Sequence, residues 1–97
     1  MVQVGNETTG GFIGETNVSN MCVLFSAGAT GVETYNPDVK VVIHVESPHK
    51  GTMVTWAENL QNNNVDYDIL ATSYYPYWHG TLDNLKSAVS DGKEYIL

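Results

Sequence analysis

The residues with the clearest chemical use are an amide and a carboxylic acid that stand side by side near the start of the chain. Asn6 and Glu7 follow the short run Val2-Gln3-Val4, which reads as a buried strand, and the glycine after it. A carboxylic acid at a strand end can protonate the oxygen that links two sugars, and a neighbouring amide can bind a sugar hydroxyl without carrying a charge. An Asn-Glu pair alone is also typical of a solvated loop, so the rest of the chain must decide between the two interpretations.

A dense run of rings supplies the other half of a sugar site. The stretch Tyr74-Tyr75-Pro76-Tyr77-Trp78-His79 follows a segment with strand character. Pyranose rings pack their flat C–H faces on aromatic rings, and the polar edges of tyrosine and tryptophan bind hydroxyls. We therefore expect Tyr74, Tyr75, Trp78 and His79 to bind substrate. Packing within the protein stays an alternative for some of these rings, Tyr77 above all.

His44 lies at the end of the β-branched run Val39–Val45, where it could bind a substrate hydroxyl. Together with Glu46, His49 and His79 it could also be imagined as part of a metal site. The spacing of these residues matches no metal-binding motif that has a mechanism behind it. We expect no metal site and no cofactor in this sequence.

Alternating strands and helices must position these residues. Strand character is found at residues 2–5, 39–45 and 67–74, and apolar residues recur at helical spacing over 18–32, 53–60 and 82–89. Asn17 and Thr81 are the expected caps of the first and third helices, and residues 93–97 look like the start of a fourth strand. This order predicts parallel strands with right-handed helical crossovers and no internal domain boundary. Because parallel strands end at one edge, the three groups of candidate residues should meet there.

Composition narrows the class of protein. With 97 residues and 42% hydrophobic content, the sequence suffices for one small domain or part of one, whereas a closed eight-fold barrel takes about 250 residues. The net charge of −7 repels phosphate backbones and anionic lipid, so neither nucleic acid nor a membrane is an expected partner. No apolar run approaches the roughly 20 residues of a membrane span, and no signal peptide opens the chain. The single cysteine, Cys22, is expected to be a buried small hydrophobe.

The motif residues resemble the endo-β-1,4-galactanases of glycoside hydrolase family 53, in the same order and at similar spacing. The strand ending in Asn6-Glu7 is shared by a wider clan of retaining barrel glycosidases. The stretch Ser-Tyr-Tyr-Pro-Tyr-Trp-His-Gly at residues 73–80 is much narrower and carries the assignment. The segments involved cover essentially the whole chain and are Met1–Glu7, Val41–His44, Tyr67-Asp68 and Ser73–Leu85.

The resemblance implies an α/β fold, namely part of a (β/α)8 TIM barrel with about strands 4 to 6, their helices and the start of strand 7, so that residues 1–97 form one incomplete catalytic domain. It implies retaining hydrolysis of internal β-1,4-galactosidic bonds in galactan or arabinogalactan. Glu7 would be the general acid/base and Asn6 would contact the sugar. The nucleophile would be a glutamate at the end of the seventh strand, about 5 to 5.5 Å from Glu7, at a position that lies beyond this sequence.

Further expectations follow from the resemblance. The sequence would be an internal fragment of a secreted enzyme and inactive alone. From the geometry of an incomplete barrel, the isolated chain is expected either to self-associate through its unpaired strand edges or to be only loosely packed. Calcium, which some family members bind beyond the seventh strand, would be held elsewhere in the parent enzyme. Two alternatives stay open: another retaining barrel β-glycanase of the mannanase or cellulase type, and a non-catalytic carbohydrate-binding fragment.

Overall fold

A three-stranded parallel sheet organises the protein, and its strand order, β1-β2-β3, follows the chain. The computed structural model describes residues 1–93. The strands are β1 (Val2–Val4), β2 (Val41–Val45) and β3 (Ile69–Thr72). Ile43 in the central strand pairs with Val4 on one side and with Leu70 on the other. The predicted parallel arrangement is confirmed, so all three strands point their carboxyl ends to the same edge.

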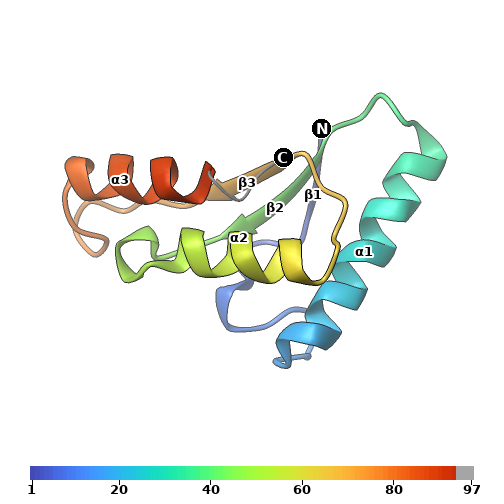
Figure 1. Ribbon diagram of the computed structural model, residues 1–97, viewed down its shortest axis with the longest axis horizontal. Helices are drawn as coiled ribbons and strands as arrows, with labels where there is room; N and C mark the ends of the chain where they lie inside the picture. The colour runs from blue at the N-terminus through green and yellow to red at the C-terminus, as the bar shows by residue number, and fades with distance from the viewer. Residues whose placement is uncertain (94–97) are drawn as a thin grey trace.

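A helix follows each strand. These helices are α1 (Val18–Tyr35), α2 (Thr52–Asn62) and α3 (Leu82–Lys93), and short 3-10 turns, η1 (Thr8–Gly10) and η2 (Pro48–Lys50), lie in the loops after β1 and β2. Helices α2 and α3 lie side by side, and α1 packs near β1 at the other end of the molecule (Figure 1). The expected caps are confirmed, since Asn17 Oδ1 accepts the Asn20 N–H at 3.1 Å and Thr81 Oγ1 accepts the Asn84 N–H at 3.1 Å.

The two faces of the sheet serve different purposes because side chains alternate along a strand. Ile43 and Val45 of β2 are fully buried and belong to the core between sheet and helices. His44, between them, therefore belongs to the opposite face and is only half-buried. The helices complete the core with apolar side chains, chiefly Met21, Cys22, Phe25, Met53, Trp56, Ala57 and Leu60.

Three details differ from the sequence-based expectations. The first strand is not buried, because β1 is an edge strand of the described sheet and leaves Val2 43% exposed. The third strand is shorter than residues 67–74, because only Ile69–Thr72 pair with β2. Lys93 ends α3, the helix that packs Ala88 and Val89 against the core, and so does not begin a strand. The rest of the expected fourth strand, residues 94–97, lies outside the described residues.

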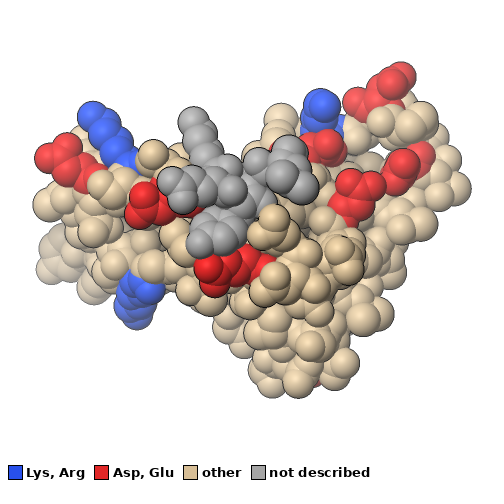
Figure 2. Space-filling model, viewed as in Figure 1, with Lys and Arg blue, Asp and Glu red and all other residues tan. Residues whose placement is uncertain are grey.

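Acidic side chains are distributed over the visible face of the molecule, with few basic ones between them (Figure 2), as the net charge of −7 requires. Within residues 1–93, no helix combines the length and the apolar character needed to cross a membrane.

The contact between α1 and β1 gives a test of the packing. A Cβ at Gly28 would lie 2.7 Å from Val4 Cγ1, whereas at Gly31 of the same helix it would meet nothing within 4 Å. Alanine improves helix propensity at either position by about 1 kcal/mol, but overpacking costs about 1 to 3 kcal/mol. In urea unfolding of the full-length protein, Gly31→Ala should raise the free energy of unfolding and Gly28→Ala should lower it. Equal effects of the two substitutions would contradict the close approach of α1 to β1.

Cys22 provides a second test. Its side chain is 1% exposed, and burial raises the pKa of the thiol, so little of the reactive thiolate forms at neutral pH. We expect Cys22 to resist a maleimide in the native protein and to react fully in guanidinium chloride, as followed by peptide mass spectrometry. Rapid native labelling would show that the core between α1 and α2 opens readily.

Candidate active site

Glu7 adopts a backbone conformation that few non-glycine residues take. Its φ of 48° and ψ of 53° lie in the left-handed region, which costs a residue with a side chain of the order of 1 to 2 kcal/mol. A hydrogen bond from the Glu7 N–H to His44 Nδ1, 2.9 Å long, holds this conformation. Such strain persists where the surroundings fix it, and it is concentrated at functional sites.

His44 connects the ends of all three strands. Its Nδ1 accepts the Glu7 N–H, its Nε2 lies 3.1 Å from Ser73 Oγ, and its carbonyl oxygen accepts the Thr8 hydroxyl at 3.0 Å. A backbone N–H can only donate, so Nδ1 carries no proton and the ring is the neutral Nε2–H tautomer, which donates to Ser73. Both ring nitrogens therefore have partners within residues 1–93, and the ring lies where it can hold the Glu7 backbone in place. The expected contact of His44 with a sugar hydroxyl stays a prediction.

Asn6 lies beside Glu7 with an exposed side chain. The Gln3 carboxamide donates to Asn6 Oδ1 at 3.2 Å and to the Gly5 carbonyl at 2.8 Å. These contacts orient the Asn6 side chain and leave its NH₂ group, which no hydrogen bond in residues 1–93 engages, available to a ligand. On the other side of Glu7, Thr9 Oγ1 accepts the Glu46 N–H at 2.9 Å and ties the loop after β1 to the loop after β2.

The aromatic loop that follows β3 is closed by its own hydrogen bonds. The Tyr75 carbonyl accepts the N–H groups of Trp78 and His79 at 2.9 and 2.8 Å, and the Tyr74 hydroxyl donates to the Gly80 carbonyl at 2.7 Å. Tyr75 is 51% exposed, Tyr77 85% and Trp78 69%. The rings of Tyr77 and Trp78 are therefore not part of the core of residues 1–93, so core packing does not account for these two side chains.

His79 differs from its neighbours because it is only 6% exposed. Its Nδ1 accepts the Tyr75 N–H at 3.1 Å, and its ring stacks on that of His49 with centroids 5.2 Å apart. These contacts make His79 a support for the aromatic loop, and its expected contact with substrate stays a prediction. Among residues 1–93 no three His, Cys, Asp or Glu side chains come together in a way that could hold a metal ion.

The structure thus brings Asn6, Glu7, His44 and Ser73 to one edge of the sheet, with the loop of Tyr74, Tyr75 and Trp78 directly after Ser73. Sequence reasoning did not single out the roles of Ser73, Gln3, Thr8 and Thr9. Ser73 could have been found from its position, since it is the first polar residue after the third strand. The roles of Gln3, Thr8 and Thr9 depend on loop geometry that the sequence pattern does not reveal.

Several known proteins have sequences similar to this chain. An endo-beta-1,4-galactanase of Bacillus subtilis (strain 168) is 51% identical over 90 residues, which are 92% of this chain and 21% of the relative. An arabinogalactan endo-beta-1,4-galactanase of Cellvibrio japonicus (strain Ueda107) is 30% identical over 105 residues, covering 94% of this chain and 27% of the relative. The chain therefore spans about a fifth to a quarter of the length of these relatives.

A solved structure has the same fold. The GH53 catalytic domain of Ignisphaera aggregans matches with a TM-score of 0.78 and 33% sequence identity, over 90% of this chain and 25% of that domain. The profile of glycosyl hydrolase family 53 matches residues 1–95. The predicted fold class is confirmed, because the family has a (β/α)8 barrel and residues 1–93 form consecutive βα units of it. With its fold, its sequence and nearly its whole length matched, the chain belongs to glycosyl hydrolase family 53.

Proposed function

We propose that these residues supply the general acid/base of a retaining glycosidase that hydrolyses internal β-1,4-galactosidic bonds in galactan or arabinogalactan, and that Glu7 is this acid/base. The observation that carries the proposal is the fixed backbone of Glu7, which is held in the left-handed region by His44 at the carboxyl edge of the sheet. Catalytic residues of barrel enzymes come from this edge. A solvated loop glutamate would need no such anchor.

In the proposed reaction the protonated Glu7 carboxyl donates its proton to the glycosidic oxygen as the bond to the anomeric carbon breaks. A second carboxylate attacks that carbon from the opposite face and forms a glycosyl-enzyme. Glu7, now ionised, then removes a proton from water, which displaces the second carboxylate and regenerates the acid. The second carboxylate is expected from the seventh strand of the barrel, beyond the described residues.

Exposed groups in the loops after β1 and β3 support a sugar substrate. The free NH₂ group of Asn6 can donate to a hydroxyl, and the uncovered rings of Tyr75 and Trp78 offer apolar faces to pyranose rings. The hydroxyl of Tyr74 already donates within the loop, so Tyr74 would contact a sugar through its ring or as an acceptor. The choice of galactan rests on the names of the relatives, two of which are galactanases. A polymeric substrate also favours a secreted parent protein.

The role of Glu7 can be tested in the full-length protein with β-1,4-galactan as substrate and β-1,4-mannan as the control polymer. Glu7→Ala should lower kcat on galactan by about 10² to 10⁴, the usual contribution of general acid/base catalysis. An aryl β-galactobioside with a good leaving group needs little protonation, so its first step should be nearly spared, and azide should rescue its turnover. Equal losses of activity on both substrates, without azide rescue, would assign Glu7 a structural role. Hydrolysis of mannan in preference to galactan would contradict the proposal that galactan is the substrate.

The positioning role of His44 gives a separate test. His44→Phe removes both ring nitrogens and should release the Glu7 backbone, lowering kcat on galactan about 10- to 100-fold with little change in KM. His44→Asn keeps an acceptor near Nδ1 and should retain more activity. If His44 acts through Glu7, the loss in His44→Phe should again be larger for poor leaving groups than for good ones. A loss expressed mainly in KM would instead indicate a direct contact between His44 and the sugar.

A further inference from the structure

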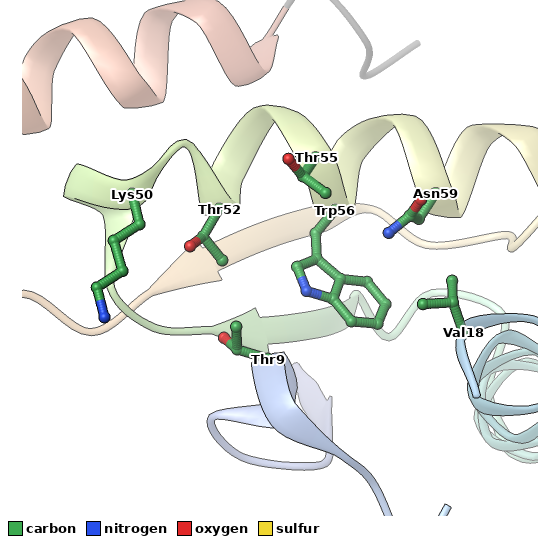
Figure 3. A pocket seen from close by; sticks show the side chains of 7 residues that line it. All are labelled: Thr9, Val18, Lys50, Thr52, Thr55, Trp56 and Asn59. Atoms are coloured by element: carbon green, nitrogen blue, oxygen red, sulfur yellow. The ribbon is translucent and has the colours of Figure 1, made fainter. Parts of the chain in front are cut away.

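An open groove of about 310 Å³ lies on the helix side of the sheet, away from the face that carries His44. The turn η1 contributes Thr9, and η2 and α2 contribute Lys50, Thr55, Trp56 and Asn59 (Figure 3). This volume is at the lower end of the range for small-molecule sites, about 300 to 1,000 Å³. The groove can therefore hold a single small ligand.

The indole of Trp56 faces this groove with an unused donor. The side chain is 4% exposed, and Figure 3 shows the edge with the ring nitrogen turned toward the space between Thr9 and Thr52. No group in residues 1–93 accepts a hydrogen bond from its Nε1–H, although the atom is not sealed inside the protein. A nearly buried indole usually finds a partner for its N–H, so a ligand atom in the groove that accepts a hydrogen bond would complete the site.

The other polar groups favour the same kind of ligand. Lys50 places an ammonium group at one end of the groove, and the Thr55 hydroxyl and the Asn59 carboxamide are free of partners within residues 1–93. An ammonium and an indole N–H can only donate, which calls for an acceptor such as a carboxylate. Hydroxyl and carboxamide groups both donate and accept, as sugar hydroxyls require.

We propose that this groove is an accessory, non-catalytic site for one sugar unit that carries a carboxylate, that is, a uronic acid. The carboxylate accepts from Trp56 Nε1 and from Lys50, and the ring hydroxyls bind Thr55 and Asn59. The net charge of −7 opposes binding of an anion in general, so the affinity depends on the local charge of Lys50. The site does not depend on the proposed acid/base role of Glu7, because it lies on the other side of the sheet.

Titration calorimetry of the full-length protein at low ionic strength tests the proposal, with galacturonate as the ligand and galactose as its neutral counterpart. All titrations use the Glu7→Gln background, which lacks the proposed acid/base. Binding in the groove is thus measured separately from catalysis by Glu7. We expect millimolar binding of galacturonate and at least fivefold weaker binding of galactose. Lys50→Met and Thr55→Val should each weaken the binding of galacturonate at least fivefold. Both residues are exposed, so neither substitution threatens the fold.

Lys86→Met, which removes an exposed ammonium from α3, is the matched control and should leave the affinity unchanged. Galactan hydrolysis by proteins that carry Lys50→Met or Thr55→Val but keep Glu7 should also be unchanged. The proposal is overturned if galacturonate fails to bind at tens of millimolar, if galactose binds equally well, or if Lys50→Met and Lys86→Met have the same effect.

Discussion

The hydrogen bond from the Glu7 N–H to His44 Nδ1 is the interaction on which the carboxyl edge of the sheet depends. It requires an unprotonated Nδ1, which fixes the tautomer and directs the Nε2 proton to Ser73. One imidazole in the central strand thus joins the loops that follow the two outer strands. The strained backbone of Glu7 and the start of the aromatic loop both depend on the position of this ring.

The opposite edge of the sheet is fixed by different means. The Asp68 carboxylate accepts the Val41 N–H at 2.8 Å, the Asp68 N–H donates to the Val41 carbonyl at 2.9 Å, and the Val2 N–H donates to the Lys40 carbonyl at 2.8 Å. These bonds set the register in which His44 lies across from Ala71. The amino-terminal edge therefore serves alignment and stability, and the carboxyl-terminal edge holds the residues that we propose for catalysis, a division typical of barrel enzymes.

The spacing of apolar residues predicted the helices and strands well, because the residues that a helix or strand buries recur with its own period. The helical stripe through Met21, Cys22 and Phe25 is buried as expected, and the parallel order follows from alternating strands and helices. The partners of His44 could not be predicted, because they depend on the register between β2 and β3 and on the left-handed turn at Glu7. The burial of His79 was missed because it depends on a stacking contact with His49, which belongs to a different βα unit.

The pair formed by Tyr77 and Trp78 has a consequence for ligand binding. The two rings meet edge to face with centroids 4.6 Å apart, although both are largely exposed to solvent. Each ring limits the rotamers that the other can adopt, so part of the side-chain entropy is already lost before any ligand arrives. Ordering an unrestrained, rotamer-rich side chain on binding costs about 0.5 to 1.5 kcal/mol. Preorganisation of this pair would spare a bound sugar part of that cost, and it would favour ligands whose curvature fits a right-angled corner over ligands that need one flat wall.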